Sequence, residues 1–229
     1  MSPPVLILRA QPAADATAER ARAAGLVPLV HPLFALRAVA WAVPDSQATA
    51  LLLTSANAVR LAGPLPDGVA RLPAFAVGPA TAAAARAAGL TVAFEGASDG
   101  AEAVRAAAAA GHRLAVHLRG EVARPLPGDL CLLPLVTYAA DALEGPLPDG
   151  LNGGVALLHS PRAAALFAGR VAAAPTRRPT PRSSLAIVAI SAAAADAAGP
   201  GWRRVEVAKR PSDGAMIRAA AQLLVDRDP

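Results

Sequence analysis

The 229-residue sequence has one cysteine, one lysine, one tyrosine and only 3% aromatic residues, and no apolar run approaches the roughly 20 residues that cross a bilayer. A single cysteine, Cys131, excludes an intrachain disulfide. It lies in an apolar run, so we expect a buried strand residue rather than a nucleophile. The start of the chain lacks the charged beginning and long apolar core of a secretory signal. These absences predict a cytoplasmic protein that does not bind membranes.

Common cofactor and metal motifs are missing as well. No GxGxxG sequence follows a predicted strand, and no glycine-rich loop ends in Gly-Lys-Ser or Gly-Lys-Thr, so no nucleotide site is predicted. The four histidines (His31, His112, His117 and His159) lack metal-ligand spacing. Ser160 follows His159 directly, and neighbours on a strand point in opposite directions, so the pair does not predict a catalytic triad.

The net charge of +5 is carried almost wholly by arginine, because Lys209 is the only lysine. Guanidinium groups bind carboxylates and phosphates in a bidentate way, which favours an anionic ligand. A codon bias toward Ala, Arg, Pro and Gly is an equally good explanation of the same composition. Basic residues are scattered and no aromatic stacking run accompanies them, so nucleic acid is not the expected partner.

Internal repetition is the strongest positive signal. Residues 51–59 (LLLTSANAV) return as residues 156–164 (ALLHSPRAA), and residues 98–101 return as residues 212–215, both SDGA. Residues 116–120 (VHLRG) resemble residues 7–10 (ILRA). The chain therefore reads as two related halves. A cleft between two such halves is a common place for a small ligand, so we expect one site shared by both.

Short apolar runs alternate with alanine-rich helical segments. The runs are continuous rather than alternating, which is typical of parallel strands covered on both faces. Expected helices, with glycine at or near the end of the first four, are 13–24, 79–88, 100–110, 160–169 and a last one from 212 onward. Expected strands are 5–8, 27–30, 50–53, 74–77, 91–94, 114–118, 130–133, 155–158, 185–190 and 205–207. This order predicts two doubly wound α/β units.

Two Pro-Leu segments, at 32–33 and 134–135, are each followed by an extended stretch and are candidate crossings between the units. They predict a discontinuous first domain, residues 1–36 with 143–229, and a continuous second domain, residues 37–142. The arginine-containing segment 175–184 is expected to be a solvated loop rather than a binding site.

Strand-to-helix turns supply most candidate site residues. Such turns present free backbone N–H groups and the positive end of a helix dipole, and in a doubly wound sheet they line the ligand-binding edge. Helix capping alone is the simpler role for any single serine among them. The candidates at these turns are Thr54, Ser55, Asn57, Gly78, Ser98, Ser160 and Ser191.

Four further candidates lie at strand ends or at a proposed crossing. Arg9 and Arg119 close equivalent strands, where each either binds an anionic ligand or makes a surface ion pair. Gly120 follows Arg119. Tyr138, the only tyrosine, lies at a proposed crossing, where it either takes part in the chemistry or anchors a hinge.

Taken in order, these motifs resemble the uroporphyrinogen-III synthase family over nearly the whole chain. The resemblance rests on the strand that ends at Arg9 and on five later segments. These are 53–59 (LTSANAV), 77–82 (VGPATA) with 87–89 (AAG), 118–121 (LRGE), 136–138 (VTY) and 159–161 (HSP).

This resemblance implies two flavodoxin-like α/β domains joined by a two-stranded β-linker, with the active site between them. It implies a cyclising lyase that removes water from hydroxymethylbilane, inverts the last pyrrole ring (ring D) through a spiro intermediate and forms uroporphyrinogen III. Neither a cofactor nor a metal is implied. Tyr138 matches the family tyrosine that helps the hydroxyl leave, and Thr81 matches a threonine of the motif at 77–82.

The second copy of that motif departs from the family, with Ser191 in place of glycine and Ala194 in place of threonine. Ser191 is therefore expected to replace the hydroxyl missing at Ala194. We expect a monomer, because the repeat supplies internally what a dimer supplies between subunits, and the upstream bilane-forming enzyme is a candidate partner. The alternative is a two-lobed binder of a small polyanion, which would have the same fold but no need of Tyr138.

Overall fold

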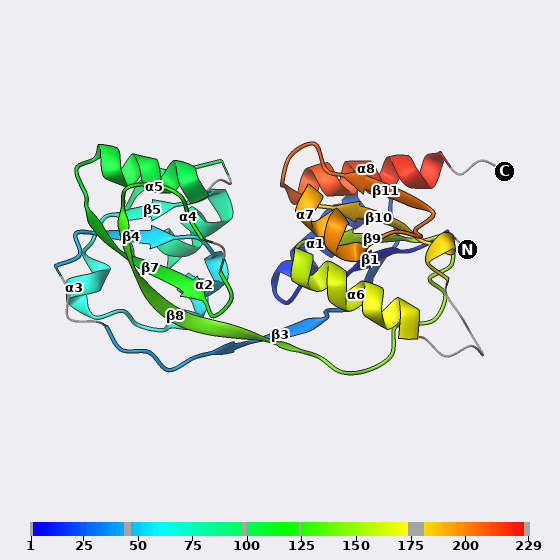
Figure 1. The fold of residues 1–229 in the computed structure, drawn as a ribbon, viewed down its shortest axis with the longest axis horizontal. Helices are drawn as coiled ribbons and strands as arrows, with labels where there is room; N and C mark the ends of the chain where they lie inside the picture. Colours follow the sequence, from blue (N-terminus) through cyan, green and yellow to red (C-terminus); the bar gives the residue numbers. More distant parts are fainter. Residues whose placement is uncertain (1, 44–46, 98–99, 124, 174–180, 227–229) are drawn as a thin grey trace. The chain divides into compact units, whose positions relative to one another are not determined.

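The computed structural model describes residues 2–43, 47–97, 100–123, 125–173 and 181–226 (Figure 1). The chain divides into two compact units. Unit 1 comprises Met1–Ala35 and Ala142–Pro229, and unit 2 comprises Leu36–Asp141. None of the described helices is both long and apolar enough to cross a membrane.

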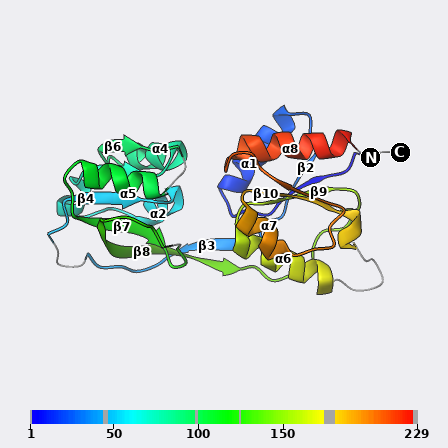
Figure 2. The same ribbon diagram turned by 45° about the horizontal axis from the view of Figure 1, so that its top comes forward.

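Unit 1 is built on a five-stranded parallel sheet with the order β11-β10-β9-β1-β2. Helices α1 and α8 cover one face and α6 and α7 the other (Figure 2). The core is aliphatic and alanine-rich, with a stacked aromatic pair, Phe167 and Trp202, whose ring centroids are 5.5 Å apart. Its elements are β1 (Val5–Ile7), α1 (Ala13–Ala23), β2 (Pro28–Val30), β9 (Val155–Leu158), α6 (Pro161–Ala173), the short 3-10 helix η1 (Arg182–Ser184), β10 (Ala186–Ala189), α7 (Ala192–Ala198), β11 (Arg204–Val207) and α8 (Asp213–Val225).

Unit 2 contains the second sheet, in the order β3-β8-β7-β4-β5-β6. Strands β4 to β8 are parallel. Helix α5 packs on one face, and α2 and α4 pack on the other. Its elements are β3 (Phe34–Ala38), β4 (Ala50–Leu53), α2 (Ala56–Ala62), α3 (Asp67–Ala70), β5 (Ala74–Ala76), α4 (Pro79–Ala87), β6 (Val92–Glu95), α5 (Gly100–Ala109), β7 (Leu114–Gly120) and β8 (Cys131–Ala142).

Strand β3 crosses the first boundary between the units, and strand β8 crosses the second. Val39 N donates to Thr137 O at 3.0 Å, and Leu143 N donates to Leu33 O at 2.9 Å. Along the pair, residue numbers fall from 39 to 33 on the β3 side while they rise from 137 to 143 on the β8 side, so the two strands are antiparallel. The chain thus leaves unit 1 and returns to it along one hydrogen-bonded ribbon.

The two parallel sheets are circular permutations of one another. In unit 1 the order β11-β10-β9-β1-β2 corresponds, strand for strand, to β6-β5-β4-β7-β8 in unit 2. The sequence repeats follow this correspondence, since they align β4 with β9, β7 with β1, and the start of α5 with that of α8. Equivalent turns therefore lie at equivalent corners of the two sheets.

The α/β class and the parallel sheets are confirmed, but several details were wrong. Edge strands are partly exposed rather than covered on both faces: the side chains of β11 include Val205 and Val207, which are 45% and 40% exposed. The described residues form eleven strands rather than ten, because residues 34–38 form an additional strand, β3, that pairs with the extended β8. Helix α6 continues past Gly169, which lies in a helical turn and does not end the helix.

Two residues were also misjudged. Cys131 is exposed, not buried, because it opens β8, where the burial pattern of the strand alternates. Arg182 is not a solvated loop residue: its guanidinium stacks over the Trp202 ring at 5.1 Å. The same group donates to the carbonyl oxygens of Ala168 and Pro200, each at 3.0 Å, so Arg182 joins helix α6 to the segment that follows α7. Arg177 and Arg178 lie outside the described residues.

Candidate active site

Tyr138 lies in β8, opposite Gly120 at the end of β7. Its hydroxyl is 3.2 Å from Ser55 Oγ, at the turn that follows β4. Ser55 caps α2 and accepts a hydrogen bond from Asn57 N at 3.2 Å. The structure therefore brings together four predicted residues, Tyr138, Ser55, Asn57 and Gly120, at the carboxyl edge of the unit 2 sheet. Tyr138 is half-buried, so its phenol is held in place and remains partly accessible.

Gly120 has no side chain because Tyr138 occupies the space. A Cβ at this position would lie 2.6 Å from Tyr138 Cζ and 2.9 Å from its Oη. Gly120→Ala is therefore expected to displace the ring and to lower kcat by roughly tenfold to a hundredfold, because small misplacements of reacting groups carry such costs. Steady-state assays would measure this, with Gly169→Ala as the control, since a Cβ there meets nothing within 4 Å. Unchanged kcat in Gly120→Ala would show that the position of the ring does not matter.

A second cluster lies on the opposite face of the same edge. His117 of β7 is buried, and its Nε2 is 2.9 Å from Thr54 Oγ1. Burial lowers the pKa of His117 to about 4, and the charge of Arg119 acts in the same direction. Arg119 has a buried Nε without a hydrogen-bond partner among the described residues. This edge presents a hydroxyl and a guanidinium, both of which bind carboxylates.

Three other candidates in unit 2 take less accessible positions or cannot be placed. Gly78 is the N-cap of α4 and is buried. Thr81 lies in the first turn of that helix and is 5% exposed. Ser98 lies outside the described residues.

In unit 1 the equivalent edge is organised by Asp213, the first residue of α8. Its Oδ1 accepts hydrogen bonds from Arg9 Nη1 at 3.1 Å and from His159 Nε2 at 2.7 Å. Its Oδ2 accepts from Thr17 Oγ1 at 2.7 Å and from Arg20 Nη1 at 2.8 Å. Arg9 is thus already paired within unit 1, with a side chain that is 32% exposed.

The hydrogen bonds around Asp213 shift the pKa values of both Asp213 and His159. Burial acts to raise the pKa of Asp213, but the hydrogen bonds from His159 and Thr17 outweigh it and hold that pKa well below its usual range. Burial lowers the pKa of His159, and the hydrogen bond to Asp213 only partly opposes this. The Asp213 carboxylate is therefore ionised at neutral pH, and His159 donates a hydrogen bond to it.

The two serines of this edge differ. Ser160 Oγ accepts a hydrogen bond from Ala163 N at 3.1 Å, so it caps α6. Ser191 is the N-cap of α7 but makes no side-chain cap bond, and its buried Oγ has no partner among the described residues. Ala194 is fully buried, so the helix packs closely at the position where the resemblance implied threonine.

Sequence reasoning missed the roles of Asp213 and His117. From the repeated SDGA sequence we inferred only that a helix starts at Asp213. The repetition of this sequence at the start of α5 and of α8 was the one signal that the aspartate itself has a role. His117 was considered only as a metal ligand. Within the described residues, no three His, Cys, Asp or Glu side chains gather as metal ligands.

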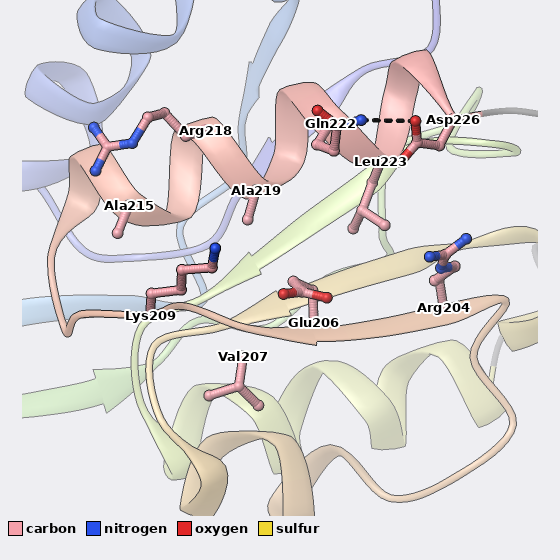
Figure 3. A pocket seen from close by; sticks show the side chains of 10 residues that line it. All are labelled: Arg204, Glu206, Val207, Lys209, Ala215, Arg218, Ala219, Gln222, Leu223 and Asp226. Atoms are coloured by element: carbon pink, nitrogen blue, oxygen red, sulfur yellow. Dashed lines mark hydrogen bonds between the residues drawn. The ribbon is translucent and has the colours of Figure 1, made fainter.

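A surface pocket lies between β11 and α8 in unit 1 (Figure 3). Arg204, Lys209 and Arg218 line it together with Glu206 and Asp226, so its charges largely cancel. None of the predicted site residues lines this pocket. It follows the outer edge of the sheet rather than the carboxyl ends of the strands, and we do not assign the chemistry to it.

Comparison with known proteins identifies the family. Residues 15–130, about half of the chain, match the family model described as uroporphyrinogen-III synthase HemD. No curated protein sequence gives a significant match. Among solved structures, uroporphyrinogen-III synthetase from Helicobacter pylori superposes with a TM-score of 0.65 at 17% identity, over 97% of this chain and 100% of that one. A mutant uroporphyrinogen III synthase from the extremely thermophilic bacterium Thermus thermophilus gives 0.50 at 19% identity, again over 97% and 100%. These likenesses establish a shared fold, and the family model establishes more: the chain belongs to the uroporphyrinogen-III synthase family.

Proposed function

We propose that this protein converts hydroxymethylbilane to uroporphyrinogen III, with loss of water and inversion of the last ring, and that Tyr138 helps the hydroxyl leave. The observation that carries the proposal is the placement of Tyr138 Oη 3.2 Å from Ser55 Oγ in a member of this family. A phenol held there can donate its proton to the departing oxygen, which then leaves as water. Ser55 orients the phenol.

The main task of the protein is conformational. Unassisted closure joins the ends of the substrate without inversion, so the enzyme must hold the flexible chain with the inverted attack nearest, which is catalysis by orientation. The substrate carries eight carboxylates. We propose that the turns at Thr54, Ser55, Asn57, Gly78, Thr81 and Ser98 bind some of them, and that Ser160 and Ser191 bind others through the second sheet edge.

Arginines complete the proposed set, with unequal roles. Arg119 and Gly120 lie at the end of β7 in unit 2, beside Thr54 and Tyr138. Arg9 also belongs to the proposed contacts, but its bonds to Asp213 and Thr17 leave only its remaining N–H groups for substrate. We therefore expect Arg119 to contribute more to substrate affinity than Arg9.

The finer architecture is part of the proposal. The order of β2, β1, β9, β10 and β11 is the 2-1-3-4-5 order of flavodoxin-like folds, and this supports two such domains, one of them permuted. The β3–β8 ribbon would be the two-stranded linker between residues 1–36 with 143–229 and residues 37–142. We further propose a cytoplasmic monomer that receives its substrate from the upstream bilane-forming enzyme.

The test is to supply freshly prepared hydroxymethylbilane and to separate the cyclic isomers after oxidation to porphyrins. We expect isomer III to accumulate faster than isomer I forms without enzyme. Isomer I alone, formed at the uncatalysed rate, would contradict the proposal. Tight binding of the substrate without closure would favour a polyanion binder instead.

A further inference from the structure

His117 is a buried titratable side chain that the proposed chemistry leaves unused. It is 5% exposed and lies on the face of β7 that packs against α5, together with Ala115. Its Nε2 is 2.9 Å from the hydroxyl oxygen of Thr54, directly after β4. Thr54 adjoins Ser55, whose hydroxyl contacts Tyr138.

The chemistry of the substrate decides how this hydrogen bond must run. Carboxylates only accept hydrogen bonds, so Thr54 binds one only if its own hydroxyl hydrogen is free to donate. A hydroxyl that donates to an imidazole nitrogen has no hydrogen left for substrate. A hydroxyl that accepts from an imidazole N–H keeps its hydrogen and has it directed away from the ring.

We propose that His117 is a positioning residue for ring closure. In its Nε2–H form it donates to Thr54 Oγ1 and so directs the Thr54 hydroxyl hydrogen toward a substrate carboxylate. This inference rests on the proposed function, because it takes the carboxylates of hydroxymethylbilane as the ligand. The low pKa of the buried ring is consistent with it, since a neutral imidazole has one donor and the tautomer fixes which nitrogen carries it.

The chain contains its own control for this pair. Thr49 Oγ1 and His112 Nδ1 are also 2.9 Å apart, and they too are separated by 63 residues. They precede β4 and β7, so they lie at the opposite ends of the same two strands. Thr49 is exposed there, far along both strands from Tyr138. The two pairs share residue types and strands and differ in their position relative to the carboxyl edge.

The experiment compares steady-state kinetics on hydroxymethylbilane in both pairs. We expect His117→Leu and Thr54→Val each to raise KM about tenfold, the scale of one hydrogen bond to a charged group. Thr49→Val and His112→Leu should leave KM and kcat unchanged. His117→Gln, whose side-chain amide nitrogen reaches the place of Nε2, should retain most of the affinity, whereas His117→Asn should not.

Two further readouts separate positioning from a merely structural role. Adding His117→Leu to Thr54→Val should cost little more than either change alone, because both remove the same donor. Correlation of ring ¹⁵N and ¹H signals in the intact protein should show the proton of His117 on Nε2. A proton on Nδ1, or a full additional loss in the double variant, would overturn the inference.

The two proposals fail in different ways. An active wild type with an unchanged His117→Leu variant would overturn this inference alone. A wild type that forms no isomer III would overturn the proposed function, and this inference with it. Melting curves for every variant establish whether a lost activity reflects a lost fold.

Discussion

Asp213→Ala is expected to lower the free energy of unfolding of unit 1 by about 1.5–3 kcal/mol, the range for hydrogen bonds to a charged group, because Arg9 and Arg20 are 32% and 56% exposed and remain partly solvated. The Asp213 side chain is 13% exposed and accepts from four donors. Without it, Arg9 and Arg20 lose their shared counter-charge. The buried N–H of His159 also loses its acceptor. The variant should therefore unfold unit 1 first.

Tryptophan fluorescence can follow the two units separately, because Trp202 lies in unit 1 and Trp41 in unit 2. In a Trp41→Phe background, denaturant titration of Trp202 fluorescence reports on unit 1. Asp141→Ala is the matched control: Asp141 pairs with Arg37 at 2.7 Å, but both side chains are more than half exposed. Exposed pairs contribute less than about 1 kcal/mol, so this control should change little.

The pH dependence of the free energy of unfolding provides a second test of the same prediction. A carboxyl whose pKa is lowered by folding stabilises the protein above its unfolded pKa of 3.8, and this contribution is lost as the pH falls below that value. The difference between wild type and Asp213→Ala should therefore shrink as the pH falls below about 4. A small difference at neutral pH, equal to that of Asp141→Ala, would show that Asp213 does not organise this edge.

The sequence predicts an element well when neighbouring residues determine it, and poorly when a partner far along the chain determines it. The strands 50–53 and 155–158 were predicted with their observed ends, because buried central strands are continuous apolar runs bounded by turns. The residues of β3 predicted only an extended stretch after the Pro-Leu segment at 32–33, and the two-stranded linker came from the family resemblance alone. Strand β3 forms only because β8, about 100 residues away, pairs with it, and no local pattern encodes that partner.

The same distinction holds for the site. Turn residues such as Ser55 and Ser160 were found from their sequence, since a strand followed by a small polar residue and a helix is a local signal. The bonds of Asp213 to Arg9 and Arg20 join residues 204 and 193 positions apart. Such contacts follow from the return of the chain to unit 1. The Pro-Leu segments at 32–33 and 134–135 predicted that return, but they did not identify the residues that pair with Asp213.

Tyr138→Phe is expected to lower kcat on hydroxymethylbilane by about a hundredfold, the lower range for a positioned general acid. Phenylalanine fills the same space against Gly120, so the packing of β8 and the shape of the edge should persist. KM should therefore change little, because the carboxylates are held by other groups. The hydroxyl alone is lost, and with it the donor to the departing oxygen.

Single-turnover assays with isomer analysis would measure this loss directly. Ser55→Ala serves as a graded comparison: it leaves the phenol in place but removes the oxygen 3.2 Å away, so a smaller loss of kcat is expected. If Tyr138→Phe turned over at the wild-type rate, the phenol would have no part in the departure of the hydroxyl, and binding by the turns alone would have to account for closure. If it instead raised KM with kcat intact, Tyr138 would be a binding residue, because a group that acts only in the transition state alters kcat and not ground-state affinity.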